Sequence, residues 1–336
     1  MLPALAVAEA LSAQGVRVTF AGSPDRVEAR LVPEAGYEFD AFRVEGFPRR
    51  PSLTQLRALG LAAAAPFACR TILGRRRPDV VLGGGGFVAG PMVLAAATMR
   101  IPAALTEADA QLGLANRLAA PFAKRLFVAY PGTRAGRKVS VVGRPIPARS
   151  RPLDQAEARE IFELPHDGPV LGVFGALAGA RALNELAVET WGAVGPAVLH
   201  QTGAHDYETV KRRVRRPDYR VIAETERYGA ALSAVDLVVA RSGSTVWEIA
   251  ACGRPAILVP YPFATGDHQA LNAEHFVRAG GAIMVRELDL DDVPDLVRTL
   301  LDDPERRARM SRAMLAAARP DAAERIAGEL IALASP

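Results

Sequence analysis

The chain has 336 residues, of which 50% are hydrophobic and 23% are charged. This usage is ordinary for globular proteins and excludes disordered, collagen-like and disulfide-scaffold classes. At about 150 residues per domain, the length predicts two domains. The 41 Lys and Arg residues exceed the 37 Asp and Glu residues by only 4, so charge alone does not indicate a nucleic-acid-binding protein. The small surplus suits ligands that carry phosphate, or an anionic membrane surface.

The cysteines and the apolar runs indicate the cellular compartment in which the protein is expected. Cys69 and Cys252 lie far apart, each in an apolar helical stretch, which fits core thiols in a reducing compartment better than a disulfide. No apolar run reaches the roughly 18 residues that span a bilayer, and no basic segment opens the chain as in a signal peptide. We therefore expect a soluble, cytoplasmic chain.

In chain order, short β-branched runs alternate with longer Ala-rich stretches of helical period. After a helix over 3–14, the first half predicts strands at 16–21, 80–82, 103–105 and 126–128, and helices that include 89–99 and 112–123. The segment 143–152 has three prolines and is expected to be a linker. The second half predicts strands at 170–174, 197–201, 219–223, 237–240, 256–259 and 283–285.

This alternation predicts the α/β fold class, with two doubly wound domains that have parallel sheets. Near-continuous apolar strands such as VVLG and AILVP are expected where helices cover both faces of a sheet. Ligands are expected outside the carboxyl ends of the strands, in a cleft that the domains share. A doubly wound domain normally begins with a strand, whereas this chain opens on a helix, so we expect a missing segment before Met1 and an unfilled edge or gap in the first sheet.

Two glycine-containing loops follow predicted strands. Gly83–Gly86 precedes a helix expected to open near Gly90, and its backbone N–H groups suit a phosphate. It is neither a Walker nor a GxGxxG motif, so a simple packing turn is an equal alternative. The second loop, GALAGAR at 175–181, precedes a helix expected to begin near Gly179 and suits a diphosphate. One such loop per domain would serve two phosphorylated ligands.

The segment ARSGSTVWE at 240–248 is a third candidate, where a strand ends in small polar residues. The carboxylate of Glu248 suits two hydroxyls of a ribose, and Ser244 and Thr245 suit a phosphate or a helix cap. The alternative is that Ser244 only caps the helix and Glu248 only complements its dipole.

A fourth candidate is the polar cluster in PYPFATGDHQALN at 260–272. Gln269 and Asn272 lie three residues apart on one helical face, a spacing that suits sugar hydroxyls. His268 either belongs to this cluster or is a solvated residue at the start of the helix.

The sequence offers little sign of a metal site. Histidines outside this cluster lack the HExxH or CxxC context of metal ligands. Asp289 and Asp291 form a DxD, but they precede a predicted helix, where acidic residues are usual. We therefore expect neither a metal nor another cofactor.

Motifs along almost the whole chain resemble, in order, those of the MurG family, the UDP-N-acetylglucosamine:lipid-linked muramyl-pentapeptide N-acetylglucosaminyltransferases of peptidoglycan synthesis. They are PALAVAEAL at 3–11, LGGGGFVAGP at 82–91, TEADAQLGLANR at 106–117, VVGRPIP at 141–147, HQTGAHDYE at 200–208, the stretch 236–262 and DHQALNAE at 267–274. The resemblance implies the GT-B fold of two Rossmann-like domains. Residues 1–145 would form the acceptor and membrane side, 146–318 the UDP-GlcNAc-binding domain, and 319–336 a helix that crosses back to the first domain.

The activity implied by the resemblance is an inverting transfer of GlcNAc from UDP-GlcNAc to undecaprenyl-diphospho-muramoyl-pentapeptide, which converts lipid I to lipid II. The implied location is peripheral, on the cytoplasmic face of the plasma membrane, with no nucleic acid as partner. Helix dipoles and hydrogen-bond donors, rather than a metal, would stabilise the leaving UDP. The alternatives are a GT-B transferase that uses another lipid or metabolite acceptor, a UDP-sugar epimerase, and an inactive nucleotide-sugar-binding homologue.

The resemblance also implies roles for single residues. On the donor side it places Glu248 on the ribose, Ser244 and Thr245 near the diphosphate, His268, Gln269 and Asn272 toward GlcNAc and diphosphate, and Gly179 and Arg181 in the donor loop. On the acceptor side it places the lipid diphosphate on the backbone of Gly84, Gly85 and Gly86.

On the acceptor side, the sequence departs from the family pattern. The family's glycine-rich loop ends in a His that is its candidate base, and this His would lie before Met1. A wrongly chosen start codon is our preferred explanation. In TEADA, Glu107 is retained but Asp109 replaces the usual Asn, and both are acceptor-side candidates.

Three further departures affect phosphate binding. Pro147 stands at the usual Arg, so Arg144 and Arg149 are candidate phosphate ligands instead. Leu177 replaces a Ser of the donor loop. The interval 241–248 is one residue shorter than the family's usual spacing.

Residues 53–77 are the candidate membrane contact. They combine apolar and basic side chains, namely Leu56, Leu59, Phe67, Ile72 and Leu73 with Arg57, Arg70 and Arg75 to Arg77. An amphipathic segment of this kind can lie on an anionic surface. The alternative is a core helix that ends in a solvated basic turn. The resemblance favours peripheral membrane contact.

Overall fold

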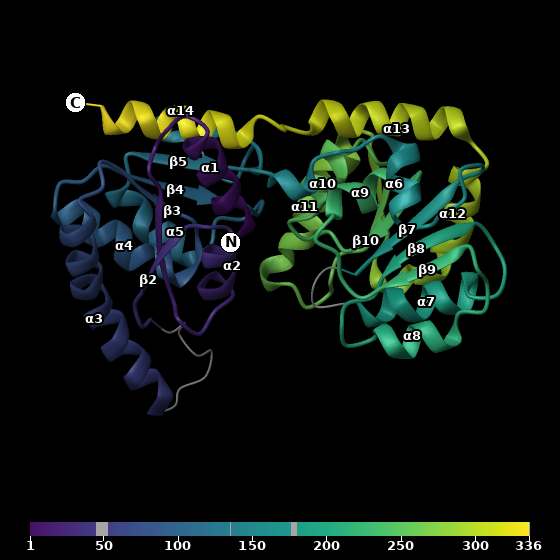
Figure 1. The fold of residues 1–336 in the computed structure, drawn as a ribbon, viewed down its shortest axis with the longest axis horizontal. Coiled ribbons are helices and arrows are strands. Elements are labelled where there is room, and N and C mark those ends of the chain that lie inside the picture. Colours follow the sequence, from purple (N-terminus) through teal and green to yellow (C-terminus); the bar gives the residue numbers. More distant parts are fainter. Residues whose placement is uncertain (45–52, 135, 176–179, 336) are drawn as a thin grey trace. The chain divides into compact units, whose positions relative to one another are not determined.

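The structure, a computed structural model, describes residues 1–44, 53–134, 136–175 and 180–335, except for the side chains of 53–63 and Thr265. The chain forms two compact units, one of residues 1–147 with 320–336 and the other of residues 148–319 (Figure 1). No helix in the described part of the chain is long and apolar enough to cross a bilayer.

The N-terminal unit consists of strands with helices between them. Its helices are α1 (Leu2–Ser12), α2 (Glu28–Glu34), α3 (Leu53–Arg76), α4 (Gly86–Thr98), α5 (Leu114–Ala119), the 3-10 helix η1 (Ala120–Phe122) and α14 (Ala322–Ala334). Its strands are β1 (Thr19–Gly22), β2 (Glu38–Ala41), β3 (Val81–Gly83), β4 (Ala103–Glu107), β5 (Arg125–Val128) and β6 (Val139–Val141). The sequence did not predict β2, whose residues EFDA include two carboxylates, or β6, which has only three residues.

All strand pairs of the N-terminal unit are parallel, but the described strands form two separate sheets. β1 pairs with β2, and the second sheet has the order β3-β4-β5-β6. Within the described residues no strand joins these two sheets, so β1 and β3 are both edge strands.

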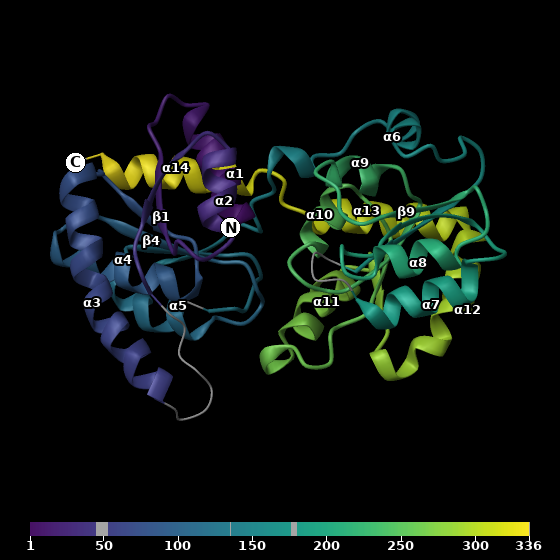
Figure 2. The same cartoon turned by 60° about the horizontal axis from the view of Figure 1, so that its bottom comes forward.

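Helices cover both faces of the four-stranded sheet. Adjacent residues of a strand point to opposite faces, so Ala104 packs in one core with α1 and α14, while Leu105 packs in the other with α3 and α4. Although α1 and α14 lie at opposite ends of the sequence, they are neighbours (Figure 2). The C-terminal helix is thus an integral part of the N-terminal unit.

The C-terminal unit holds the second set of alternating elements. Its helices are the 3-10 helix η2 (Ala148–Ser150), α6 (Gln155–Ile161), α7 (Arg181–Trp191), α8 (Tyr207–Arg213), α9 (Tyr228–Ser233), α10 (Val246–Ala251), η3 (Thr265–Asp267), α11 (His268–Arg278), η4 (Glu287–Asp292), α12 (Val293–Leu301) and α13 (Pro304–Ala317). Its strands are β7 (Val170–Phe174), β8 (Ala197–Gln201), β9 (Tyr219–Ile222), β10 (Leu237–Ala240), β11 (Ala256–Leu258) and β12 (Ala282–Met284).

The six strands of this unit form one parallel sheet in the order β12-β11-β10-β7-β8-β9. The first strand, β7, therefore lies beside the fourth, β10, and the chain turns in opposite directions along the sheet on either side of this pair. Such a switch point is where open α/β sheets bind ligands. Phe174 and Ala240, at the carboxyl ends of the two strands, are directly paired. The loops that follow them consequently begin side by side.

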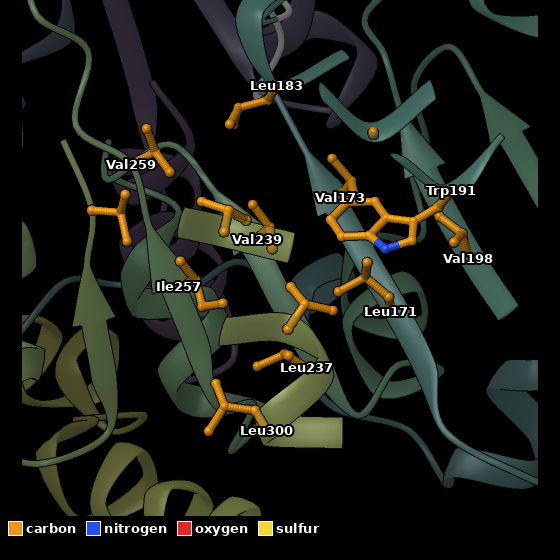
Figure 3. Close-up of a cluster of buried hydrophobic side chains, with 14 of the residues drawn as sticks. Leu171, Val173, Leu183, Trp191, Val198, Leu237, Val239, Ile257, Val259 and Leu300 are labelled. Carbon is orange, nitrogen blue, oxygen red and sulfur yellow. The ribbon is translucent and has the colours of Figure 1, made fainter. Parts of the chain in front are cut away.

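The core of the C-terminal unit explains why its strands are almost wholly apolar. Every second residue of β7, β10 and β11 points into one cluster, in which Trp191 of α7 and Leu300 of α12 are also buried (Figure 3). The intervening strand residues are buried on the opposite face. Because neither face is exposed, the strands lack the polar alternation of a half-buried sheet.

Candidate functional site

The loop between β10 and α10 lies at the switch point, and α11 holds it in place. Asn272 of α11 is fully buried, and its Nδ2 donates a hydrogen bond to the backbone oxygen of Ser242 at 3.2 Å. The hydroxyl of Ser242 is also buried, and it has no hydrogen-bond partner among the described residues. A buried hydroxyl without a hydrogen bond at the end of a strand is unusual in a folded protein.

Gln269, one turn earlier on α11, is hydrogen-bonded to the loop after β11 and lies close to Gly243 of the loop after β10. Its Oε1 accepts a hydrogen bond from the backbone N–H of Tyr261 at 2.9 Å, and its Nε2 lies 3.9 Å from the position of a Cβ built on Gly243. Gln269 and Asn272 therefore face one loop, as their spacing predicted. His268 is half-buried at the first position of the helix.

Glu248 is more enclosed than a solvated helix residue would be. It is the third residue of α10 and only 2% exposed, and its Oε1 accepts a hydrogen bond from the hydroxyl of Ser150 at 2.7 Å. Ser150 is itself fully buried. A specific side-chain hydrogen bond therefore holds the carboxylate of Glu248 in the first turn of α10.

The two small polar residues before α10 are half-buried. Thr245, rather than Ser244, occupies the N-cap position, and the side chain of Thr245 makes no capping hydrogen bond in the described structure. The backbone of this short loop and its hydroxyls lie directly after β10, beside the end of β7.

The loop after β7 is described only in part. Gly179 lies outside the described residues, as does Leu177. The helix expected to begin near Gly179 begins instead at Arg181, which is exposed at the first position of α7.

A buried polar network lies at the end of β8. The ring of His200 is hydrogen-bonded through Nδ1 to the hydroxyl of Tyr219 and through Nε2 to Oδ1 of Asn184, each at 2.9 Å. Burial lowers the pKa of His200 to about 3, so the ring is neutral at physiological pH. Gln201 follows, and its Oε1 is buried with no hydrogen-bond partner in the described part of the chain. Both residues open the motif HQTGAHDYE, but neither was assigned a role from the sequence.

In the N-terminal unit, the glycine run forms a tight connection between β3 and α4. The helix begins at Gly86, so the expected start near Gly90 is wrong. Gly85 and Gly86 have φ values of +87° and +70°, in a region that residues other than glycine rarely adopt. Gly84 and Gly86 are exposed, and the 13-residue helix that follows directs its free N–H groups toward them.

Glu107 ends β4, the neighbour of β3, and organises the loop that leads into α5. Its Oε2 accepts hydrogen bonds from Gly113 N–H and from Asn116 Nδ2, both at 2.9 Å, and its Oε1 accepts one from Asp109 N–H at 3.3 Å. Asn116 is buried, and its Nδ2 lies 3.8 Å from a Cβ built on Gly85. The carboxylate therefore holds the loop beside the glycine run.

The two candidate phosphate arginines differ in exposure. Arg144 is 6% exposed, whereas Arg149 is exposed on η2. The side chain of Arg149 is therefore the more accessible to a ligand in solution.

The candidate membrane segment forms most of α3, and its basic end is occupied by ion pairs. Arg76 Nε lies 2.7 Å from Asp40 Oδ2, Arg75 also pairs with Asp40, and Arg76 pairs with Glu38. The side chain of Arg75 is 64% exposed and that of Arg76 is 22% exposed, so the basic turn is both ion-paired and solvated. Leu73 is buried and Phe67 is 73% exposed. The structure does not describe the side chains of Leu56, Arg57 and Leu59.

A second exposed apolar surface, which we did not predict, lies just after the Glu107 loop. Leu114 and Leu118 of α5 are both 66% exposed, and Phe122 of η1 is 48% exposed. Their spacing of four residues places the two leucines on one face of the helix. We call Leu114, Leu118 and Phe122 the α5 stripe. Arg117, which is also exposed, lies between Leu114 and Leu118 in the sequence. The sequence pattern that could have predicted the α5 stripe is an apolar residue at every fourth position of the predicted 112–123 helix.

Among the described residues, no group of three or more His, Cys, Asp or Glu side chains is placed to hold a metal ion. Asp289 of the DxD lies in η4.

Each half of the chain matches a domain of one known protein family. Residues 1–128 match the model of the glycosyltransferase family 28 N-terminal domain, and residues 170–326 match that of the family 28 C-terminal domain. The UDP-N-acetylglucosamine–N-acetylmuramyl-(pentapeptide) pyrophosphoryl-undecaprenol N-acetylglucosamine transferase of Acidithiobacillus ferrooxidans is 40% identical, over 98% of this chain and 94% of the relative. The enzyme of the same name from Salinibacter ruber is 37% identical, over 99% and 93%.

Solved structures show the same fold. MurG of Acinetobacter baumannii has a TM-score of 0.79 and 26% identity, covering 98% of this chain and 95% of that one. The calicheamicin glycosyltransferase CalG4 has a TM-score of 0.70 and 19% identity, which shows a shared fold alone. From both domain models and from relatives that match over nearly their whole length, the chain belongs to glycosyltransferase family 28 and, within it, to the MurG family of GT-B transferases.

Proposed function

We propose that this protein transfers GlcNAc from UDP-GlcNAc to undecaprenyl-diphospho-muramoyl-pentapeptide, the step from lipid I to lipid II of peptidoglycan synthesis. The names of relatives that match over nearly the whole chain support this reaction. The observation that carries the proposal is the polar cluster at the switch point, where Ser242, Glu248 and Asn272 are buried around one loop.

On the donor side, Glu248 accepts hydrogen bonds from the ribose hydroxyls. The loop with Ser244 and Thr245 binds the diphosphate. Gln269 and Asn272 contact GlcNAc from α11, with His268 at the helix start beside the diphosphate. The paired ends of β7 and β10 support this assignment, because they start the donor loop with Arg181 and the loop after β10 side by side.

On the acceptor side, the backbone N–H groups of Gly84, Gly85 and Gly86 bind the lipid diphosphate at the start of α4. Glu107 acts as a positioning residue, since the hydrogen bonds from Gly113 and Asn116 already occupy its carboxylate. Asp109, in the loop that Glu107 holds, is the candidate for direct contact with the acceptor.

In the chemical step, a muramyl hydroxyl attacks the anomeric carbon of GlcNAc while the bond from that carbon to the diphosphate oxygen breaks, and the hydroxyl releases its proton to solvent. The configuration inverts and UDP leaves with the bonding electrons. Backbone N–H groups and hydroxyls after β10 stabilise the charge that develops on the diphosphate. We expect the reaction to need no metal ion, and turnover in the presence of a chelator tests this point.

The acceptor lipid requires contact with the cytoplasmic face of the membrane. We propose that the N-terminal unit makes this contact through the α5 stripe and Phe67 of α3. The exposure of these side chains supports the assignment, and Arg117 and Arg70 supply positive charge for anionic headgroups.

The test is UDP release from UDP-GlcNAc with a soluble lipid I analogue, measured for the wild type and for Glu248→Gln. Acceptor-dependent turnover that the substitution reduces supports the proposal. Binding of UDP-GlcNAc without transfer to the analogue would overturn the peptidoglycan acceptor and leave either another acceptor or a binding-only role.

A further inference from the structure

Ser150 is a buried residue that neither the sequence motifs nor the comparisons single out. It ends η2, three residues after the N-terminal unit's first segment ends at residue 147. Its hydroxyl donates a 2.7 Å hydrogen bond to Oε1 of Glu248, which lies 98 residues later in the chain. Both side chains are almost completely buried, at 0% and 2% exposure.

The position of Ser150 is fixed by contacts other than Glu248. Gly229 of α9 packs against its backbone so closely that a Cβ there would lie 2.0 Å from the oxygen of Arg151. The thiol of Cys252 lies 3.8 Å from the backbone oxygen of Ser150, and the backbone N–H of Leu153 donates to the hydroxyl of Ser233 at 3.0 Å. Ser150 is therefore a pre-positioned donor rather than a mobile one.

A pre-positioned donor has a defined effect on a buried carboxylate. The two oxygens of a carboxylate together offer about four acceptor positions. A hydrogen bond from Ser150 to Oε1 uses one of them and fixes the rotation of the carboxyl plane, so that the remaining positions point in defined directions. A carboxylate held in this way can receive ligand hydroxyls without first losing rotational freedom.

We propose that Ser150 is a positioning residue that orients the Glu248 carboxylate toward the ribose hydroxyls of the uridine diphosphate group. It thereby sets the preference of the site for ribose over 2′-deoxyribose. This inference rests on the proposed function, in which Glu248 binds the donor ribose.

The test compares the binding of UDP and of 2′-deoxyuridine 5′-diphosphate by calorimetry. In Ser150→Ala, we expect the affinity for UDP to fall by about 10-fold, as for loss of a hydrogen bond to a charged group, with a smaller fall for the deoxynucleotide. The ratio of the two affinities therefore decreases. In a Glu248→Gln background, Ser150→Ala should change that ratio no further.

Ser233→Ala is the matched control, because it removes another buried hydroxyl from the contacts of the same segment without touching Glu248. It should leave the ratio unchanged, and thermal melting shows whether either variant is unfolded. Equal losses for both nucleotides in Ser150→Ala, or no loss, would overturn the positioning role while the donor site stands. A wild type that binds neither nucleotide would instead overturn the proposed function itself.

Discussion

The two units of this protein organise their polar groups in different ways. In the C-terminal unit, buried polar residues beyond the end of β10 are bonded to other elements, Ser242 to α11 and Glu248 of α10 to η2. In the N-terminal unit, two separate sheets are described, and one carboxylate, Glu107, holds a loop that leads to the exposed α5 stripe.

The difference follows from what each unit is proposed to bind. A nucleotide sugar is small and polar, and a site with preorganised hydrogen bonds recognises it at low entropic cost. A lipid-linked acceptor arrives at a membrane surface, where exposed apolar side chains are an advantage. The same doubly wound architecture thus supports a polar, buried site in one unit and an apolar, exposed surface in the other.

The largest effect is expected where the polar site is broken directly. Glu248→Gln should lower kcat/KM for UDP-GlcNAc by about 10- to 100-fold, because a hydrogen bond to a charged group contributes about 1.5–3 kcal/mol. Steady-state kinetics of UDP release measure this. Glu226→Gln removes an exposed carboxylate of the same unit and should have no effect. An unchanged kcat/KM in Glu248→Gln would contradict the donor assignment.

Acid should weaken the C-terminal unit through His200. Its folded pKa is lowered to about 3 by burial, so the unfolded chain binds a proton that the folded chain does not between about pH 6.5 and pH 3. The contribution of the residue to stability is complete above pH 6.5 and is lost as the pH falls, by about 2 kcal/mol at pH 5.

Urea unfolding at pH 7.5 and pH 5 measures this loss, followed by tryptophan fluorescence, because both tryptophans of the chain, Trp191 and Trp247, lie in the C-terminal unit. His200→Gln should flatten the pH dependence, whereas the exposed His166→Gln should retain it. Equal slopes in wild type and His200→Gln would show that another group is responsible.

The acceptor loop should respond to a change that leaves the donor site intact. Glu107→Gln replaces one of the accepting oxygens with an amide that donates, so the loop loses either the hydrogen bond from Asp109 or those from Gly113 and Asn116. We expect kcat/KM for the acceptor to fall roughly tenfold while KM for UDP-GlcNAc stays unchanged. Asp79→Asn, at an exposed position of the same unit, is the control. A rise in KM for UDP-GlcNAc instead would place Glu107 on the donor side.

The smallest effect is expected at the membrane surface. Leu118→Glu should weaken binding to anionic phospholipid vesicles roughly fivefold, because an interfacial leucine only partly leaves water. Activity with a soluble acceptor should remain. Leu288→Glu alters a leucine that is 98% exposed on the other unit and serves as the matched control in vesicle sedimentation. Similar losses in both variants would argue against a specific role for the α5 stripe.

The C-terminal sheet was the more predictable of the two units. The bounds of β7, β8 and β10 match the predicted strands, because runs such as Val170–Phe174 are apolar throughout and end at polar or glycine residues. β2 escaped prediction because its charged residues, Glu38 and Asp40, pair with Arg75 and Arg76 of α3, a partnership that no local pattern shows.

The candidate site likewise has features that the sequence predicted and others that it did not. The spacing of Gln269 and Asn272 placed both on one helical face, and the structure brings both to the loop after β10. The roles assigned to these residues stay predictions. The partners of Glu248 and Glu107 were not foreseen.

The sequence by itself determined the alternation of strands and helices and the faces on which polar residues lie, because those depend on periodicity within a single element. Tertiary structure alone decided that Ser150 meets Glu248, that α14 packs on α1, and that the α5 stripe is exposed. These features depend on segments far apart in the chain. Their contacts form only when the whole unit packs around its sheet.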